Sequence, residues 1–385
     1  MRVCHVSPHL PPDQAANALL PADLAAWGHA RGDTVTMVTY EAAQGRAGED
    51  PPSARVWRLP RRPEAGAVSR LLRVDSLRHA RLIAAALDEA AGEADLLHLH
   101  SNGLIIEVAA AWAARRRTPY VLTLYGTEIW HYRRRRPIDP FTRAYRRARA
   151  VTFYSRKLME RARAIGHDRP GLSVIYPPIG AAFQPVDEAT RAAWRASLGI
   201  AEPRVILNVK RLHELAGQRD LIEAFARVAR ERRDVRLVIC GTGPLREALD
   251  AQVREAGLAD RVTFTGLVPN EVVARYAAVA DLFVLPSLLE ALPTVAVEAL
   301  ASGTPVISAD HPGGRELHEL FGDDLRLVPR NAPDRLAEAL VDALTKPRRA
   351  TAATLGLVEA RFGAAAIHAA FSGVYRTVVD QSPPA

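Results

Sequence analysis

The sequence predicts two Rossmann-like α/β domains, each built on a doubly wound parallel sheet, that face each other across a cleft. Three observations predict this fold class. The chain has 385 residues, more than one compact core usually holds. Short β-branched, apolar runs alternate with amphipathic helical patterns throughout, as in parallel sheets covered by helices on both faces. A stretch rich in Pro and Gly, 176–187, interrupts this alternation and is typical of an interdomain linker.

Strand candidates occur on both sides of this linker, and their positions set the expected domains. They are 2–7, 34–40, 54–59, 95–99, 119–124, 150–154 and 172–176 before it, and 204–209, 235–240, 261–265, 281–286, 304–308 and 325–328 after it. We expect an N-terminal domain over 1–180 and a C-terminal domain over 181–361. The helical stretch 362–385 follows a complete second sheet, so it either caps that domain or crosses back to the first. Ligands of such sheets bind at the carboxyl ends of the strands, which we expect to line the cleft.

The composition is ordinary for a globular protein, with 48% hydrophobic and 24% charged residues. It excludes a disordered chain, a collagen-like repeat and a membrane bundle, because no apolar run approaches ~18 residues. The first residues lack the pattern of a signal peptide, so we expect a cytoplasmic location. Cys4 and Cys240 lie in apolar, strand-like runs and are expected to be buried, unreactive thiols.

The net charge of +8 is distributed unevenly along the chain. Residues 1–180 contain 27 basic and 17 acidic residues, and 115–169 alone contain 16 basic against 4 acidic. One interpretation is a surface that meets an anionic partner, such as lipid headgroups on the inner face of the membrane, a phosphorylated acceptor or nucleic acid. The other is a solvated face of an arginine-rich protein, since the chain has only three lysines. No nucleic-acid-binding motif accompanies the charge, so nucleic acid is not the expected partner.

The segment 281–300 carries the clearest chemical pattern. A buried strand ends at Pro286, a loop carries Glu290, a helix begins near Pro293, and Glu298 follows about two turns later. A helix N-terminus attracts anions such as phosphate groups. Two carboxylates near one helix start can accept hydrogen bonds from the vicinal hydroxyls of a sugar or a ribose.

The stretch 204–316 resembles the donor-binding domain of the retaining family-four (group 1) glycosyltransferases, which have the GT-B fold. The family's elements appear in order as Arg211, Gly241-Thr242-Gly243-Pro244, Thr263-Phe264-Thr265-Gly266, Ala280-Asp281, Glu290 to Glu298, Gly303-Thr304-Pro305-Val306, and Gly313-Gly314 with Glu316.

This resemblance implies roles for the donor-side residues. Glu298 would hold the ribose hydroxyls of a nucleotide sugar, and Arg211 would neutralise the charge that develops on the leaving diphosphate. Glu290 and the segment after it would meet the donor sugar and the diphosphate. The donor-binding candidates are Gly241, Ala291, Leu292, Pro293, Thr294 and Glu298, and the catalytic candidates are His100, Arg211 and Glu290.

Two donor-side positions depart from the family pattern. Ala216 stands where the family usually has a lysine that contacts the diphosphate. Lys210 and His213 are candidate replacements, although strand alternation would point Lys210 and Arg211 to opposite faces. Ala291 replaces the usual glycine after the first glutamate and would narrow the space for the sugar.

The acceptor-side half resembles the family through two strands. The run 95–100 resembles the family's Asp-x-x-His-x-His element, which implies that His100 lies by the acceptor oxygen and the donor C1, whereas His98 is expected to be structural. The run 123–128 resembles Thr-x-His-Gly-x-Asp/Glu, with Tyr125 in place of the histidine. Tyr125 and Glu128 are therefore acceptor-side candidates.

The first strand is followed by a less typical segment. Family members often have Gly-Gly there, and these positions hold Ala15 and Ala16, whose Cβ atoms limit the approach of a diphosphate. Asn17 or Gln14 could supply a hydrogen-bond donor instead. Later in the domain, Ser155 is expected to cap a helix.

The resemblance predicts a retaining, metal-independent, hexosyltransferase-type glycosyltransferase without a cofactor. The donor would be a nucleotide-diphosphate sugar, a UDP-sugar rather than a GDP-sugar, and the acceptor a hydroxyl in cell-envelope polysaccharide or secondary-metabolite synthesis. No carboxylate is placed as a covalent nucleophile, so we expect same-face attack with the leaving diphosphate accepting the proton.

Three readings compete, of which this prediction is the first and a GT-B protein with another chemistry is the second. A GT-B nucleotide-sugar epimerase shares the fold, and a phosphorylase would need a pyridoxal-binding lysine, for which the three lysines offer no convincing motif. A basic nucleic-acid-binding α/β protein or a dinucleotide-dependent oxidoreductase is the third, but no Gly-x-Gly-x-x-Gly follows the first strand.

Overall fold

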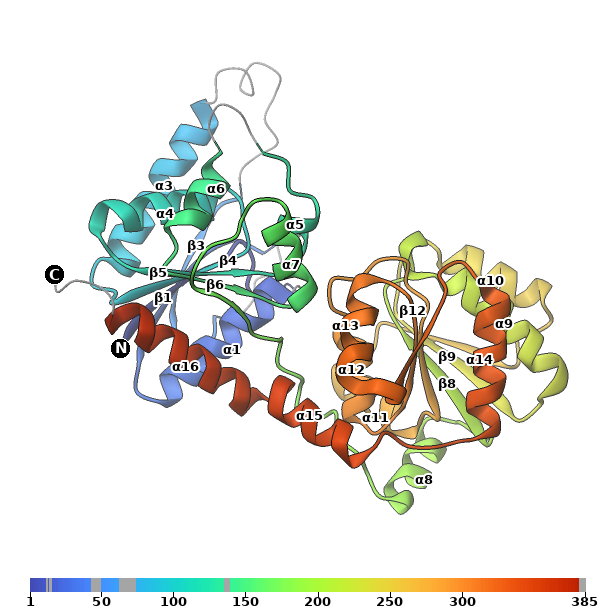
Figure 1. Cartoon of the computed structure of the whole chain (residues 1–385). Helices are drawn as coiled ribbons and strands as arrows, with labels where there is room; N and C mark the ends of the chain where they lie inside the picture. The colour runs from blue at the N-terminus through green and yellow to red at the C-terminus, as the bar shows by residue number, and fades with distance from the viewer. Residues whose placement is uncertain (12, 14–15, 43–49, 62–73, 135–138, 381–385) are drawn as a thin grey trace. The chain divides into compact units, whose positions relative to one another are not determined.

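The computed structural model describes residues 1–11, 13, 16–42, 50–61, 74–134 and 139–380 (Figure 1). The chain forms two compact units. Unit 1 comprises Met1–Pro177 and Ile367–Ala385, and unit 2 comprises Pro178–Ala366. The first division falls inside the Pro-containing linker, and the second lies near the start of the last helix, which packs with unit 1.

Unit 1 is built on a seven-stranded sheet with the order β3-β2-β1-β4-β5-β6-β7 and parallel pairing between neighbours. Its strands are β1 (Arg2–Val6), β2 (Thr34–Tyr40), β3 (Arg55–Leu59), β4 (Leu96–His100), β5 (Tyr120–Leu124), β6 (Ala150–Phe153) and β7 (Leu172–Val174). Its helices are α1 (Ala16–Ala30), α3 (Val74–Ala91), α4 (Leu104–Arg116), α5 (Thr127–Trp130), α6 (Pro140–Arg147), α7 (Arg156–Ala164) and α16 (Ala364–Asp380). Helices α1 and α16 cover one face of this sheet, and α3, α4 and α6 cover the other (Figure 1).

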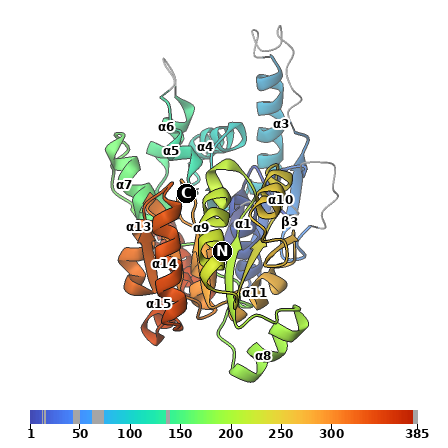
Figure 2. The ribbon, with the colours of Figure 1, turned by 90° about the vertical axis from the view of Figure 1, so that its right-hand side faces the viewer.

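Unit 2 is built on a six-stranded parallel sheet with the order β10-β9-β8-β11-β12-β13, the doubly wound order of dinucleotide-binding folds. Its strands are β8 (Arg204–Val209), β9 (Val235–Cys240), β10 (Val262–Gly266), β11 (Leu282–Leu285), β12 (Val306–Ala309) and β13 (Leu325–Val328). Its helices are α8 (Glu188–Ser197), α9 (Gln218–Glu231), α10 (Arg246–Glu255), α11 (Asn270–Val279), α12 (Thr294–Ala301), α13 (Pro312–Phe321), α14 (Pro333–Thr345) and α15 (Ala352–Phe362), with short 3₁₀ turns at Glu214–Ala216 and Gly322–Asp324. Helices α9, α10 and α14 lie on one face and α11, α12 and α13 on the other (Figures 1 and 2).

Each sheet is buried between its helical layers, as the near-continuous apolar strands predict. The core of unit 1 includes Leu97 and Leu122, and that of unit 2 includes Ile206 and Leu237, all without exposed surface. Central strands that are buried on both faces explain why their apolar runs do not alternate with polar residues. The sheets therefore supply rigid frames from whose carboxyl ends the loops project.

Polar side chains fix the ends of several helices and strands. Ser155 accepts a hydrogen bond from Leu158 N at 3.1 Å and caps α7, which confirms its predicted role. Asp281, just before β11, accepts from Val205 N at 2.8 Å and pairs with Arg191 of α8 at 2.9 Å. The Ala-Asp element thus ties α8 to the start of β8 and β11.

Both cysteines are free and buried, as predicted. Burial raises the pKa of the Cys4 thiol to about 12 and that of Cys240 to about 11, so both stay protonated and unreactive near neutral pH. Within the described ranges, the helices are all too short or too polar to cross a membrane.

Candidate active site

The donor-side candidates of unit 2 lie at the carboxyl ends of neighbouring strands. Arg211 follows β8 and Gly241 follows β9, and the two segments stay paired beyond the strands, because Leu212 N donates to Thr242 O at 2.9 Å. The Arg211 side chain is exposed and makes no hydrogen bond or ion pair with any described residue. An unpaired guanidinium at a strand end is suited to bind a phosphate group.

Lys210 lies beside Arg211 but has a partner. Its Nζ atom is 2.5 Å from Oε1 of Glu290, and the two side chains are only 22% and 15% exposed. The alternation that predicted opposite faces does not apply here, because β8 ends at Val209 and Lys210 already belongs to the loop. The loops after β8 and β11 thus meet through one ion pair.

Glycines allow this close approach between the loops. Gly241 has φ +142°, and a Cβ there would lie 2.1 Å from the carbonyl oxygen of Lys210. A Cβ on Gly243 would lie 2.2 Å from the carbonyl oxygen of Leu212. A larger residue at either position would displace the backbone that carries Arg211.

The loop between β11 and α12 is held on both sides in the same way. A Cβ on Gly217 would lie 2.2 Å from the carbonyl oxygen of Pro286. On the other side, Gly313 N donates to the carbonyl oxygen of Glu290 at 3.1 Å, and a Cβ on Gly313 would lie 2.9 Å from that of Ala291. The backbone around Glu290 is therefore fixed between the start of α9 and the start of α13.

Helix α12 begins as the sequence predicts. Ala291 and Leu292 precede Pro293, which occupies the N-cap position, and Thr294 is the first helical residue. Among the described residues no side chain caps this terminus, so its first N–H groups lack a side-chain acceptor there. An uncapped helix N-terminus carries partial positive charge and free donors for an anion.

The two glutamates of this segment differ in their surroundings. Glu290 is ion-paired, whereas the carboxylate of Glu298, on α12, makes no hydrogen bond or ion pair with a described residue. Burial raises the pKa of Glu298 to about 7. A largely buried carboxylate without a partner is costly unless a ligand donates hydrogen bonds to it.

The position of the missing lysine is occupied by a buried residue. Ala216 has no exposed surface. His213 caps the 3₁₀ turn, where its Nδ1 accepts a hydrogen bond from Leu215 N at 3.2 Å, so this nitrogen is engaged within the loop. His311 is buried, and burial lowers its pKa to about 4. Lys210, the other candidate replacement, is the residue that pairs with Glu290.

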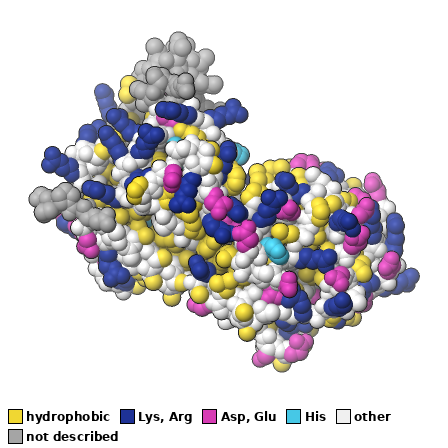
Figure 3. Space-filling view, viewed as in Figure 1, with side chains coloured by type: hydrophobic (Ala, Val, Ile, Leu, Met, Phe, Trp, Pro, Cys, Tyr) yellow, Lys and Arg dark blue, Asp and Glu magenta, His cyan; other side chains and the backbone are white. Residues whose placement is uncertain are grey.

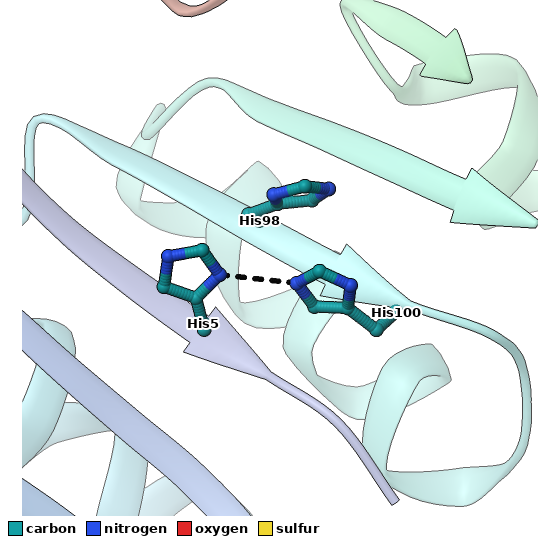
Figure 4. Close-up of side chains that lie close together, drawn as sticks. All are labelled: His5, His98 and His100. Atoms are coloured by element: carbon teal, nitrogen blue, oxygen red, sulfur yellow. Dashed lines mark hydrogen bonds between the residues drawn. The ribbon is translucent and has the colours of Figure 1, made fainter. Parts of the chain in front are cut away.

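In unit 1, three histidines share one face of the sheet at β1 and β4. His5 lies opposite His98 in the strand register, and His100 follows two residues later on the same face (Figure 4). All three have at most 2% of their surface exposed. The ring centroids of His98 and His100 are 3.9 Å apart. We call these residues the histidine cluster.

The histidine cluster is hydrogen-bonded internally and to hydroxyl groups. His5 Nδ1 and His100 Nε2 are 3.0 Å apart (Figure 4), and His100 Nδ1 lies 2.7 Å from Tyr125 Oη. His98 Nδ1 lies 2.7 Å from Tyr375 Oη, and its Nε2 lies 2.6 Å from Thr123 Oγ1. Burial lowers the pKa of His5 to about 3 and holds the pKa of His98 and His100 well below the usual value, so the cluster is neutral at pH 7.

The histidine cluster is also the part of the described structure where three potential metal ligands converge. One nitrogen from each ring lies within 4.8 Å of the others. However, both nitrogens of His98 and His100 already have partners inside unit 1, which satisfies these buried polar atoms without a metal.

The two acceptor-side candidates that follow β5, Tyr125 and Glu128, differ in exposure and in hydrogen-bond partners. Tyr125 is partly exposed, and its hydroxyl bonds to His100. Glu128 is 3% exposed, and its carboxylate accepts hydrogen bonds from Ser101 Oγ at 2.5 Å and from Gly126 N at 2.7 Å. Glu128 therefore braces the turn after β5, and His100 lies behind Tyr125.

The segment after β1 is described only in part. Asn17 is partly exposed in the first turn of α1, and its carbonyl oxygen accepts a hydrogen bond from Ser7 Oγ at 2.5 Å. The backbone of Ala16 starts that helix. Gln14 and Ala15 lie outside the described residues.

Two site features were not predicted. The Lys210–Glu290 pair depends on how two loops meet, and no pattern along the chain signals it. His5 joins the cluster because β1 pairs with β4, ninety residues away in sequence. A histidine in the first apolar strand was a signal that could have suggested a buried polar network.

Comparisons with known proteins identify both halves of the chain. Residues 190–355 match the family described as "Glycosyl transferases group 1", and residues 21–178 match the "Glycosyl transferase 4-like domain". The first match covers the loops of Arg211 and Glu290, and the second covers the histidines of β4.

Curated relatives extend this similarity over most of the chain. The chain is 31% identical over 309 residues to 2-deoxystreptamine N-acetyl-D-glucosaminyltransferase from Streptomyces fradiae, covering 75% of this chain and 72% of the relative. It is 33% identical over 258 residues to a putative teichuronic acid biosynthesis glycosyltransferase from Bacillus subtilis, covering 66% and 61%. These names do not favour the epimerase, phosphorylase or nucleic-acid-binding readings.

The fold has close counterparts among solved structures. Anabaena HepE, solved in complex with UDP, superposes with a TM-score of 0.77 at 19% identity, covering 98% of this chain and all of that one. This similarity, with the seven- and six-stranded parallel sheets, confirms the GT-B fold. With the similarity in sequence over three quarters of its length, the chain belongs to the group 1 glycosyltransferases.

Proposed function

We propose that the chain transfers a sugar from a nucleotide-diphosphate donor to an acceptor hydroxyl with retention and without a metal. The observation that carries this proposal is the start of α12 without a side-chain cap, together with two charged groups that have no partner among the described residues: the exposed guanidinium of Arg211 and the largely buried carboxylate of Glu298. The start of α12 and Arg211 suit a diphosphate, and Glu298 suits the hydroxyls of a ribose.

Unit 2 supplies the donor site in this proposal. Arg211 and the first N–H groups of α12 bind the diphosphate, and Lys210 adds the cation that Ala216 cannot. Because Glu290 already accepts from Lys210, its carboxylate is held in place for a hydroxyl of the donor sugar. Glu298 accepts the ribose hydroxyls, and Gly241 keeps the segment of Arg211 in position. The backbone that leads from Glu290 into α12 carries Ala291, Leu292, Pro293 and Thr294 past the diphosphate.

Unit 1 supplies the acceptor site. Tyr125 meets the acceptor hydroxyl, Asn17 offers a second polar contact, and His100 and Glu128 support the strand ends behind them. The acceptor oxygen attacks C1 of the sugar on the face that the diphosphate leaves. The C1–O bond to the diphosphate breaks as the new C1–O bond forms, and the acceptor proton passes to the departing diphosphate oxygen. The neutral His100 is too weak a base to keep that proton.

The donor and acceptor classes follow from the relatives and the charge. We favour a UDP-sugar, supported by the structural neighbour that holds UDP. The relatives named above are, by their names, a 2-deoxystreptamine N-acetyl-D-glucosaminyltransferase and a teichuronic acid biosynthesis glycosyltransferase, which supports a hydroxyl acceptor in secondary-metabolite or cell-envelope polysaccharide synthesis. The basic first unit favours an acceptor at an anionic membrane surface.

Two variants test the donor site against each other. Glu298→Ala should weaken donor binding at least tenfold with a smaller effect on kcat, because the ribose contact is the same in ground and transition states. Arg211→Ala should lower kcat by about 100-fold, because its charge is needed most when the diphosphate leaves. Thermal shifts with UDP, GDP, dTDP and ADP identify the base. Equal and mild effects of both variants, or no shift with any nucleotide, would contradict the proposal.

A further inference from the structure

His98 is held between the last helix and the middle of the sheet of unit 1. Its Nδ1 lies 2.7 Å from the hydroxyl of Tyr375 on α16, and its Nε2 lies 2.6 Å from Thr123 Oγ1 on β5. Thr123 Oγ1 in turn lies 2.6 Å from Thr152 Oγ1 on β6. The ring of His98 therefore has no free nitrogen, and one of its two partners comes from 277 positions away in the chain.

Helix α16 also covers the histidine cluster with aromatic rings. The centroids of Phe371 and Tyr375 lie 5.3 and 5.6 Å from that of His98, and both residues are at most 3% exposed. They are four residues apart and so lie on one face of the helix. This face excludes water from the three imidazoles.

Contacts at the rim fix the position of α16 on unit 1. His368 stacks on Trp27 of α1 with ring centroids 4.8 Å apart, and its Nε2 lies 2.8 Å from Asp23 Oδ2. Arg31 donates to Ser372 Oγ at 3.0 Å. The helix is thus docked through polar and aromatic contacts on α1 as well as through its buried face.

From His98 the contacts continue to the acceptor side. The His98 ring packs against His100, whose two nitrogens bond to His5 and to Tyr125. His100 has no exposed surface, so it can affect a substrate only through Tyr125, which is partly exposed.

We propose that Tyr375 is a positioning residue for the transfer reaction: by clamping His98 it holds the His5–His100–Tyr125 chain in one hydrogen-bonded arrangement. This inference rests on the proposed function, which places Tyr125 at the acceptor hydroxyl.

The hydrogen-bonded series from His5 through His100 can present the hydroxyl group of Tyr125 in two ways. If His5 donates to His100, then His100 Nδ1–H donates to Tyr125, and the phenol proton points to the acceptor oxygen or to the hydroxyl of Tyr154, with which Tyr125 also interacts. If Tyr125 donates to His100, then His100 Nε2–H donates to His5, and the phenol oxygen can accept the acceptor's O–H. Both arrangements are neutral, so the cluster can suit either hydroxyl orientation without taking up charge.

Few charged groups surround the cluster, which keeps it neutral. The titratable groups that face it are Tyr125 and Glu128 after β5, Tyr154 after β6 and Tyr375 on α16. The charged groups near these phenols are Asp23 on α1, which lies near Tyr154, and the oppositely charged Arg31 and Asp33, which act on Tyr375. Burial keeps the pKa of Tyr125, Tyr154 and Tyr375 well above the usual value, so none of these phenols ionises near neutral pH. Admission of water would therefore allow the imidazoles to take up protons.

The test compares two buried tyrosine hydroxyls. Tyr375→Phe removes the 2.7 Å contact to His98, and the control Tyr145→Phe removes a buried hydroxyl that donates to His167 O, also at 2.7 Å. We expect Tyr375→Phe to lower kcat about tenfold with KM for the nucleotide sugar unchanged, and Tyr145→Phe to leave both unchanged. Tyr375→Ala should add an acid limb to the pH profile of kcat near pH 6–6.5, where exposed imidazoles titrate. Equal kinetics of the two Phe variants would overturn the proposal.

A spectroscopic measurement tests the proposal without relying on turnover. In ¹⁵N NMR of the whole protein, assigned with single His→Gln variants, His5, His98 and His100 should stay neutral between pH 8 and 5.5, and Tyr375→Ala should make His98 titrate. Protonation of His98 in the wild type at pH 6.5, or one bound zinc held by the cluster, would overturn it. A wild type that binds no sugar nucleotide would instead refute the proposed function, whatever the imidazoles do.

Discussion

At the scale of single residues, Glu290 and Glu298 show how surroundings separate two identical side chains. They stand eight positions apart around one helix start. Glu290 has Lys210 at 2.5 Å, whereas the carboxylate of Glu298 has no partner in the part of the chain that the structure describes. Burial raises the pKa of Glu298 to about 7. A ligand that donates hydrogen bonds would compensate the desolvation of the Glu298 carboxylate. It would stabilise Glu290 less, because that carboxylate already has a partner.

We predict that nucleotide binding strengthens as pH rises towards 7. Ribose hydroxyls donate to the ionised form of Glu298, so below pH 7 binding must first release its proton. The dissociation constant of UDP should fall roughly fivefold from pH 6 to pH 7 and about twofold more by pH 8, and then level off, as expected for one linked proton with a pKa of about 7. Isothermal titration calorimetry in two buffers would also detect the released proton. In Glu298→Gln the dependence should disappear, and a persistent slope in that variant would contradict the role.

The stability of the free protein provides the control. The folded pKa of Glu298 lies above its unfolded value, so the folded state binds the proton more tightly. Stability should therefore fall as pH rises from about 4.5 to 7 and stay lower above that window. Glu298→Gln should be more stable than the wild type at pH 8 by about 3 kcal/mol, and no different at pH 4.

The residues that the sequence identified are those with a local signal. Arg211 after a strand, Pro293 at a helix start and Ser155 as a cap depend on neighbours a few positions away. The Lys210–Glu290 pair and the hydrogen bond between His98 and Tyr375 join segments 80 or more positions apart. Their formation depends on loop direction and on helix docking, which no spacing along the chain encodes.

At the scale of elements, the strands could be predicted because buried parallel strands have distinctive apolar runs. The predicted 204–209, 235–240 and 325–328 coincide with β8, β9 and β13. The packing of α16 could not be predicted in the same way. Its sequence is compatible with either unit, and the choice follows from tertiary contacts such as the stacking of His368 on Trp27.

We predict that Gly241, which follows β9, is needed for the shape of the neighbouring loop after β8. In Gly241→Ala the new Cβ would collide with the Lys210 carbonyl at a φ that L residues rarely adopt. We expect a loss of about 2–4 kcal/mol of stability in unit 2 and at least tenfold weaker UDP binding. Gly257→Ala is the matched control, because Gly257 also has positive φ but open space around it. It should cost about 1 kcal/mol and leave UDP binding unchanged. Urea unfolding and calorimetry measure both, and similar UDP affinities in the two variants would contradict the prediction.

At the scale of the whole molecule, the two units differ in charge. The excess of basic residues lies before position 180, and unit 1 carries many of the Lys and Arg side chains seen in Figure 3. Exposed arginines follow one another from the end of α4 to α6 and α7: Arg115, Arg116, Arg117, Arg133, Arg134, Arg143, Arg146, Arg147, Arg161 and Arg163. We call these residues the basic face. Unit 2 has no comparable excess, so any long-range attraction to an anionic surface acts on unit 1.

We predict that the basic face binds anionic membranes. Each basic side chain near such a surface contributes about 1 kcal/mol, and salt screens the attraction within about 10 Å at 0.1 M. In sedimentation assays, vesicles with 30% phosphatidylglycerol should retain the protein at 0.1 M salt and release it at 0.5 M, and phosphatidylcholine vesicles should not bind it.

Replacing Arg143, Arg146 and Arg147 with Glu should abolish binding, because all three are exposed on one short helix. Replacing Arg227, Arg230 and Arg254 of unit 2, a control of equal charge change, should have little effect. If both triple variants lose binding equally, net charge and not the basic face accounts for the attraction; if neither does, the arginine-rich face is only solvated.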